Sequence, residues 1–163
     1  TSRGLEWTVE GSVKVDNKIV WSCISTMLHR CKTDIDRELK TPVMKEGSPQ
    51  DWLVKSNMGR RYAKVSGDYN PIHLADVTAK LFGFKRAIVH GMWSKARCLA
   101  MLTEHLPDDG YTVDVNFHRP LFLPSKVLFY TKQNRGQTQF SLFNQTGEHA
   151  HLEGSMSQDL TNA

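Results

Sequence analysis

The sequence predicts an α+β fold in which an antiparallel β-sheet wraps around one buried helix. Four segments rich in β-branched and aromatic residues support the sheet: 111–118, 125–133, 137–144 and 150–157. Short turn signals separate these segments, which is typical of antiparallel hairpins. The segment 92–106 precedes them and is apolar over most of its helical circumference, so we expect a buried helix. One helix followed by a meander of strands gives the α+β class.

The length and composition agree with one folded domain. The chain has 163 residues, enough to bury a hydrophobic core without disulfides or metal ions. Apolar residues make up 39% and charged residues 23%, which excludes a disordered chain. The formal net charge is +4, without a run of like charges. We therefore expect no nucleic-acid partner, while the small positive excess suits an anionic small molecule or an acidic protein.

The cysteines and the absence of long apolar runs indicate a cytoplasmic protein. Cys23, Cys31 and Cys98 are odd in number and form no C-x-x-C pair, so we expect reduced thiols. No stretch reaches the ~20 apolar residues of a membrane span, and the N-terminus lacks the apolar core of a secretory signal. The first residue is Thr1 rather than Met, which suits a processed chain or part of a longer one.

The first thirty residues are predicted to form one long β-hairpin. Residues 6–16 alternate between apolar and polar side chains, a turn follows, and residues 19–28 are again rich in β-branched side chains. Because an isolated hairpin is marginally stable in water, it should pair with another element. The polar segment 31–51 is broken by Pro and Gly, which marks a linker. We place the main boundary there, dividing the chain into 1–45 and 46–163.

Two helices are predicted between this linker and the apolar helix. Residues 52–65 have a helix-compatible spacing of apolar side chains, and Gly67 follows as a stop signal. Asn70 is a candidate N-cap with Pro71 at the first helical position, so we expect a second helix over 70–83.

The loop between these two helices carries chemically active side chains. The segment 66–73, SGDYNPIH, places a carboxylate, an amide and an imidazole within six residues. Gly67 allows a tight turn, Asp68 lies before the helix, and His73 lies in its first turn, so the two functional side chains can project toward one volume. The positive end of a helix dipole favours an ionised carboxylate and a neutral imidazole there, by roughly 0.3–1 kcal/mol each. Both groups could then accept a proton near neutral pH.

The segment 88–92, IVHGM, leads into the apolar helix. The first backbone N–H groups of a helix have no partner within it, so they could hold a developing oxyanion. Gly91 has no side chain and would let a ligand carbonyl approach closely. A carbonyl held there, with an acid–base pair near its β-carbon, describes proton and water chemistry on an α,β-unsaturated carbonyl.

These two segments resemble the MaoC-like dehydratase family. SGDYNPIH fits the hydratase motif SGD-x-NP-[ILV]-H, GF and AIVHGM follow at close range, and the resemblance covers residues 52–157. It implies a hot-dog fold, in which a curled antiparallel sheet surrounds one long helix. It also implies an (R)-specific enoyl-CoA hydratase, a hydro-lyase of fatty acid metabolism that interconverts trans-2-enoyl and (3R)-3-hydroxyacyl thioesters. Coenzyme A or an acyl carrier protein would carry the acyl group.

The resemblance also implies roles for individual residues. Asp68 and His73 are the implied catalytic pair that binds and activates water, and the Gly91 amide is the implied oxyanion donor. Asn70 is implied to position this constellation, although capping alone would explain it. Candidate substrate contacts are Ser66, Gly67, Lys85, Arg86, His90 and Met92. Surface solvation is the alternative for the two cations, and a structural role beneath the helix is the alternative for His90.

No metal or resident cofactor is expected. The other histidines do not have the spacing of a known metal motif: His105, His118, His149 and His151. The coenzyme A or phosphopantetheine group would arrive as part of the substrate.

The N-terminal hairpin resembles the closing strands of the first repeat in two-repeat members of the family. The chain departs from that pattern because it has no room before Thr1 for the helix and leading strands of such a repeat. The hairpin would add to its own or a partner's sheet or, within a longer protein, complete a double hot dog. We expect a homodimer, or pairing with another hot-dog half, because hot-dog domains usually leave a sheet edge to a second copy.

Two rival functions stay open. A non-catalytic subunit that binds acyl thioesters or assembles a hot-dog complex would keep the fold, but the intact set of Asp68, Asn70 and His73 argues against it. A hot-dog thioesterase would hydrolyse the thioester, but such enzymes lack the SGD-x-NP-x-H run.

Overall fold

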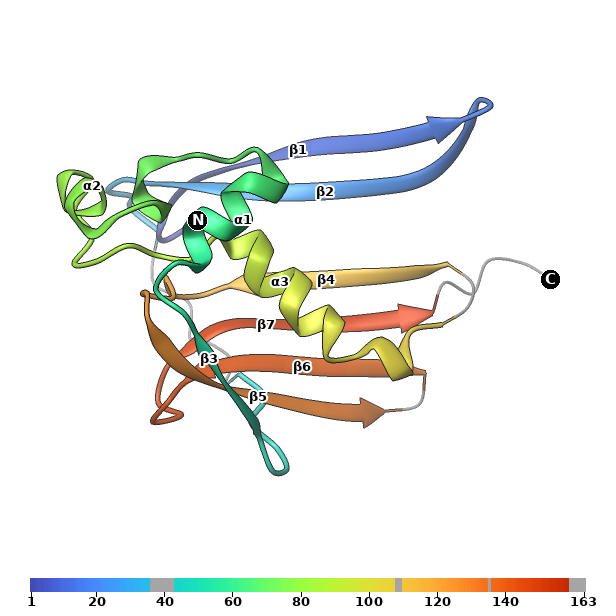
Figure 1. The fold of residues 1–163 in the computed structure, drawn as a ribbon. Helices are drawn as coiled ribbons and strands as arrows, with labels where there is room; N and C mark the ends of the chain where they lie inside the picture. Colours follow the sequence, from blue (N-terminus) through green and yellow to red (C-terminus); the bar gives the residue numbers. More distant parts are fainter. Residues whose placement is uncertain (36–42, 108–109, 135, 159–163) are drawn as a thin grey trace. The chain divides into compact units, whose positions relative to one another are not determined.

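The computed structural model describes residues 1–35, 43–107, 110–134 and 136–158. The chain divides into two compact units, Thr1–Pro42 and Val43–Ala163 (Figure 1). The elements are β1 (Gly4–Val15), β2 (Lys18–Arg30), β3 (Gln50–Val54), α1 (Met58–Ser66), η1 (Pro71–His73), α2 (Asp76–Leu81), α3 (Gly91–Ala100), η2 (Thr103–His105), β4 (Tyr111–Phe117), β5 (Ser125–Asn134), β6 (Gln137–Asn144) and β7 (Ala150–Gln158). In the part of the chain that is described, no helix is long and apolar enough to cross a membrane.

The first unit contains the antiparallel hairpin of β1 and β2, which confirms the prediction from the alternating pattern. Its register begins with Gly4 opposite Arg30 and closes at the turn formed by Asp16 and Asn17. Both turn residues have positive φ, 48° and 63°, as a two-residue hairpin turn of this hand requires. The exposed large apolar side chains of the hairpin are Leu5, Trp7, Val9, Val13, Val15, Ile19, Val20, Trp21, Ile24 and Met27.

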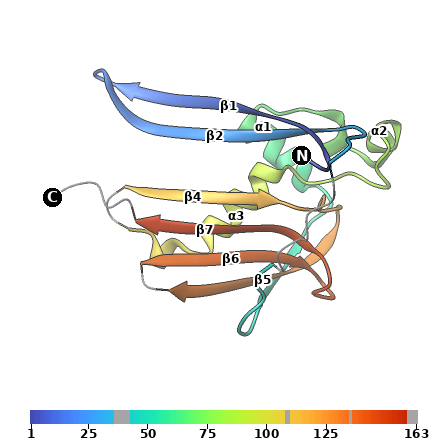
Figure 2. The ribbon, with the colours of Figure 1, turned by 180° about the vertical axis from the view of Figure 1, so that it is seen from behind.

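The second unit is built on a five-stranded antiparallel sheet with the order β3-β5-β6-β7-β4. Views from opposite sides show α3 lying across one face of this sheet (Figures 1 and 2). The four strands predicted after the helix are confirmed. The fifth strand, β3, pairs with β5 from Gln50 opposite Phe129 to Val54 opposite Ser125. The predicted layout of one helix wrapped by an antiparallel sheet is therefore present.

The hydrophobic core of this unit lies between α3 and the sheet. Val127 and Phe129 on β5 alternate along the strand, as do Phe140 and Leu142 on β6, and all four are at most 1% exposed. Side chains at every second position point to the same face of a sheet. Cys98 faces this core from α3 and is also fully buried.

The opposite face of β6 is covered as well. Ser141 and Phe143 are buried there, although they alternate with the core residues. The Ser141 hydroxyl donates to the carbonyl of Met44 at 2.6 Å. The Lys45 ammonium donates to the carbonyl of Gly147 at 3.0 Å and lies 5.8 Å from the ring centroid of Phe143. Residues 44 and 45 thus pack on the outer face of the sheet.

The helix predicted over 52–65 begins later than expected, because its first residues belong to the sheet. Residues 50–54 form β3, and the Trp52 ring packs on Phe129 with 5.5 Å between the ring centroids. The helix itself starts at Met58. Backbone pairing with β5 outweighs the helix-like spacing of these apolar residues.

The single helix predicted over 70–83 is wrong, because the chain forms two short helical pieces there. Ala75 separates η1 from α2 with an extended backbone, φ −155° and ψ 155°. The Thr78 hydroxyl donates to the carbonyl of Pro71 at 2.6 Å, and the Asp76 carboxylate accepts from the N–H of Ala87 at 2.8 Å. The hydrogen bond between Thr78 and Pro71 joins the two pieces across the break, and the bond between Asp76 and Ala87 ties α2 to the following segment.

The apolar helix predicted over 92–106 is shorter and less enclosed than expected. α3 ends at Ala100, and the short η2 follows. Ser94 and Cys98 are buried, whereas Met92 is 56% exposed and Arg97 is also exposed. Only one face of the helix packs against the sheet, so fewer of its apolar residues are buried than its composition predicts.

Substitution of Leu142 by alanine should lower the free energy of unfolding by about 2–5 kcal/mol, because it leaves a cavity in a core position that is 0% exposed. Urea unfolding followed by tryptophan fluorescence measures the change. Leu81→Ala is the matched control, since Leu81 is 81% exposed on α2. Equal effects of the two substitutions would contradict this description of the core.

Candidate active site

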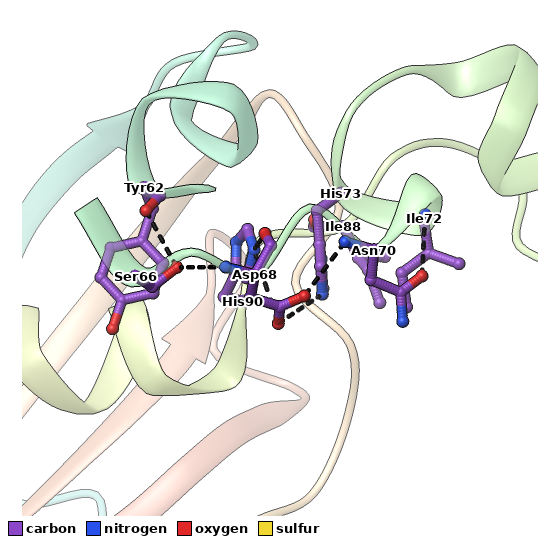
Figure 3. A network of polar contacts seen from close by, with 8 residues as sticks. All are labelled: Tyr62, Ser66, Asp68, Asn70, Ile72, His73, Ile88 and His90. Atoms are coloured by element: carbon purple, nitrogen blue, oxygen red, sulfur yellow. Dashed lines mark hydrogen bonds and ion pairs between the residues drawn. The ribbon is translucent and has the colours of Figure 1, made fainter. Parts of the chain in front are cut away.

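The loop that carries Asp68 begins where α1 ends. Gly67 is the C-cap of α1 and has φ 74°, a left-handed conformation that favours glycine, and its N–H donates to the carbonyl of Ala63 at 2.9 Å. The Ser66 hydroxyl donates to the carbonyl of Tyr62 at 3.0 Å and accepts from the N–H of Asp68 at 3.2 Å (Figure 3). Ser66 and Gly67, predicted as substrate contacts, thus shape the turn that presents Asp68.

The Asp68 carboxylate is held on one oxygen and open on the other. Its Oδ1 accepts from the N–H of Asn70 at 3.0 Å. The Asn70 side chain in turn accepts from the N–H of Ile72 at 3.3 Å, so it caps η1. Oδ2 faces two imidazole rings, 4.0 Å from Nε2 of His73 and 3.8 Å from Nε2 of His90 (Figure 3). The side chain is 53% exposed and remains open to solvent.

His73 presents one unprotonated nitrogen toward this carboxylate. Its Nδ1 lies 2.8 Å from the carbonyl of Ile88. A carbonyl only accepts, so Nδ1 carries the hydrogen, and in the neutral ring Nε2 carries the lone pair. The distance of 4.0 Å between Nε2 and Asp68 Oδ2 is too long for a direct hydrogen bond and suits a water molecule shared by the two groups.

The pKa of His73 is lowered, chiefly because burial disfavours the charged imidazolium. The neighbouring His90 ring lowers it further, whereas the hydrogen bond to Ile88 and the Asp68 carboxylate oppose the shift. His73 is therefore neutral at pH 7 and able to accept a proton.

His90 lies directly against His73, at the residue before α3. Its side chain is 3% exposed, and its ring stacks on that of His73 with centroids 3.7 Å apart and an interplanar angle of 25°. Its Nε2 lies 2.9 Å from the carbonyl of Asp68, which only accepts, so this nitrogen donates. The Tyr62 and His90 rings pack edge to face, with 5.0 Å between the ring centroids. The structure thus places His90 beside both members of the predicted pair.

Gly91 opens α3 immediately after His90. A Cβ atom at this position would lie 3.2 Å from the nearest atom of the Phe117 ring, closer than most such contacts. The Gly91 amide is one of the first amides of α3, which have no acceptor within the helix. Met92 follows and is 56% exposed. This helix start therefore combines backbone donors that have no acceptor within the helix with little side-chain bulk at Gly91.

Lys85 and Arg86 are not part of this cluster. Both are exposed on the segment before Ala87, and the Arg86 guanidinium lies 5.9 Å from the ring centroid of Phe122. Among the described residues, neither forms an ion pair. Their predicted contact with the substrate phosphates stays a prediction.

Two further residues, Gly59 and Ile88, fix the site and were not predicted from the sequence. A Cβ atom on Gly59 of α1 would overlap the carbonyl oxygen of His73, so only glycine lets the helix pass this close to η1. Ile88 donates its N–H to the carbonyl of Ile72 at 3.1 Å while its own carbonyl holds the His73 ring. An isolated glycine inside a helical pattern was the available signal for Gly59, whereas the hydrogen bonds of Ile88 depend on tertiary structure.

Among the described residues, Asp68, His73 and His90 form a cluster of side chains that could ligate a cation. One potential ligand atom of each lies within 4.8 Å of the others. The hydrogen bond from His90 Nε2 to the Asp68 carbonyl uses the nitrogen that a metal would need. Two ligand atoms then remain, fewer than the three or four protein ligands of typical zinc sites. The arrangement fits acid–base chemistry better than metal binding.

An antiparallel sheet with one central helix across its face is the arrangement of a hot-dog domain (Figure 1). The model of the MaoC like domain family matches residues 30–153, so the chain belongs to this family. This confirms the resemblance inferred from the SGDYNPIH and HGM segments.

Known relatives carry related names. The chain is 34% identical over 158 residues to 3-hydroxyacyl-thioester dehydratase X of Mycobacterium tuberculosis, covering 94% of this chain and 56% of that protein. It is 33% identical over 69 residues to the (R)-specific enoyl-CoA hydratase of Aeromonas caviae, covering 40% of this chain and 52% of that protein. The crystal structure of HtdX from Mycobacterium tuberculosis superposes with a TM-score of 0.81 at 34% identity, over 97% of this chain and 64% of that one. The chain thus spans little more than half the length of these relatives.

His73 should titrate below its ordinary pKa of 6.5 in an NMR titration of its ring signals, assigned by comparison with His73→Gln. Because the unfolded chain then takes up this proton at a higher pH than the folded chain, stability should fall as the pH drops below 6.5. Urea midpoints above and below this pH test the linkage, and the His73→Gln variant should lose this part of the dependence. A His73 pKa at or above 6.5 would contradict the described burial.

Proposed function

We propose that the chain catalyses the reversible hydration of trans-2-enoyl thioesters to (3R)-3-hydroxyacyl thioesters. The observation that carries this proposal is the spacing of 4.0 Å between the Asp68 carboxylate and the unprotonated nitrogen of His73. These two acceptors can share one water molecule by receiving its two hydrogens. The names of the relatives support the same chemistry, which is the addition or removal of water at a β-carbon.

In the proposed reaction the water oxygen bonds to the β-carbon while one member of the pair accepts a proton from it. The π bond between the α- and β-carbons breaks, and its electrons pass to the thioester oxygen as an enolate. The Gly91 amide and the positive end of α3 stabilise this oxyanion. The accepted proton then goes to the α-carbon, so water is added without any other reactant. Asn70 keeps the carboxylate oriented through its N–H.

Asp68→Asn and His73→Gln should each lower kcat/KM for crotonyl-CoA by about 10²–10⁴-fold, because each removes one of the two groups that bind and activate the water. Loss of enoyl absorbance measures the reaction, and circular dichroism checks that folding is unchanged. Val77→Ala on the exposed side of α2 is the control and should keep the wild-type rate. Wild-type rates in either site variant would exclude the assignment.

A wild-type protein that binds crotonyl-CoA without converting it would favour the non-catalytic subunit. Release of free coenzyme A together with an unhydrated 2-enoic acid would favour the thioesterase. Parallel assays with crotonyl groups on coenzyme A and on an acyl carrier protein identify the preferred carrier, which the proposal leaves as either of the two.

The proposal includes a homodimer. The strands β3 and β4 are the edges of the sheet, and a second copy would satisfy the open backbone groups of such an edge. The exposed apolar side chains of the β1–β2 hairpin support its pairing with a further sheet, as in the two-repeat members that it resembles. The three cysteines are free, which supports a reducing, cytoplasmic location.

Multi-angle light scattering at micromolar concentration should give twice the chain mass of 18.6 kDa. Chemical cross-linking provides an independent measurement of the same association. A single species at the mass of one chain would contradict the dimer.

A further inference from the structure

We propose that His90 is a positioning residue of this reaction, because one side chain holds both Asp68 and His73 in place. This inference rests on the proposed hydration chemistry. From the sequence alone, His90 is either a substrate contact or a structural histidine beneath the helix. Its contacts in the structure assign it a third role, in which it acts on the substrate through the catalytic pair.

The first contact fixes the loop that carries the carboxylate. Asp68 forms two other hydrogen bonds, from its N–H to Ser66 and from the N–H of Asn70 to its Oδ1, and both join residues only two positions apart. The bond from His90 Nε2 to the Asp68 carbonyl, 2.9 Å long, spans 22 residues. Among the hydrogen bonds of Asp68 within the described residues, it is the one that ties this half-exposed residue to the start of α3. Without it, the carboxylate would be held by its own turn alone.

The second contact fixes the direction of the His73 ring. The hydrogen bond from Nδ1 to Ile88 anchors one corner of this ring but leaves it free to pivot about that bond. The stacked His90 ring, 3.7 Å away, occupies one face and removes this freedom. Nε2 of His73 therefore stays aimed at the Asp68 carboxylate. The electrostatic effect of the nearby His90 also lowers the pKa of His73, which favours a neutral ring that can accept a proton.

Neither helix capping nor simple burial explains a histidine at this position. His90 is the N-cap residue of α3, where Ser, Thr, Asn or Asp would stabilise a helix, yet its side chain makes no capping hydrogen bond. Its Nδ1 is buried without a partner among the described residues. A buried polar atom without a partner lowers stability. The residue thus keeps an unfavourable atom in the core, and the contacts that offset it are those to Asp68 and His73.

Two substitutions separate the two contacts. His90→Phe keeps a flat ring against His73 but loses the donor to Asp68, whereas His90→Gln keeps a donor but loses the ring. We expect both to lower kcat for crotonyl-CoA by about tenfold or more, since small misplacements of catalytic groups are costly, with little change in KM. His149→Gln is the control, because His149 is exposed on the loop before β7 and should keep wild-type kinetics.

The pH profile provides a readout that a purely structural role would not change. The groups that face His73 are Asp68 and His90, and the Tyr62 ring faces His90 from α1. Removing the second imidazole in His90→Gln removes one cause of the lowered pKa of His73. The acidic limb of kcat/KM should therefore move to higher pH in this variant. Wild-type kcat and an unmoved acidic limb in both variants would overturn the proposal.

A failure of this inference is distinguishable from a failure of the proposed function. If the wild-type protein does not hydrate crotonyl-CoA, the function is wrong, and the NMR titration of His73 still tests the contact, since its pKa should rise in His90→Gln. If neither variant folds, the wild-type titration decides: the ring signals of His90 must shift as His73 takes up its proton. Independent behaviour of the two rings would exclude the positioning role.

Discussion

The hydrogen bond between the His73 ring and the carbonyl of Ile88 is the interaction on which the rest of the site depends. It places the hydrogen on Nδ1 and leaves Nε2 as the atom that faces Asp68. The acceptor belongs to a segment that is itself fixed by the bond from the Ile88 N–H to Ile72. A backbone group, which no side-chain substitution removes directly, therefore sets the tautomer of the proposed base. The loop, η1 and the start of α3 form one hydrogen-bonded unit around it.

Much of this arrangement could be predicted from local sequence. Alternation of apolar and polar residues predicted the first strand of the hairpin, and runs of β-branched and aromatic residues between turn signals predicted the other strands of the hairpin and the last four strands. The segment from Ser66 to His73 contains its own turn and cap, so the positions of Asp68 and Asn70 follow from bonds between close neighbours. These features need no information from distant parts of the chain.

The features that were mispredicted depend on distant contacts. Trp52 has the spacing of a helical residue but lies in β3, because β5 offers it a partner 75 positions later, at Val127. The predicted helix over 70–83 is interrupted at Ala75, and Asp76, directly after the break, accepts from the N–H of Ala87 eleven positions later. The contact of His90 with His73 could not be inferred from spacing either, since 17 positions and the helix α2 separate them. Tertiary pairing decides such cases over intrinsic preference.

The close passage of α1 over η1 has a consequence for attempts to stabilise this domain. A glycine inside a helix weakens it by ~1 kcal/mol relative to alanine, and engineering by helix propensity would therefore choose Gly59 among its first targets. Here the carbonyl oxygen of His73 occupies the space that the methyl group of an alanine at position 59 would need. A substitution that strengthens α1 at this position would therefore displace His73, the proposed base. Stabilising substitutions in this domain should be made at other positions.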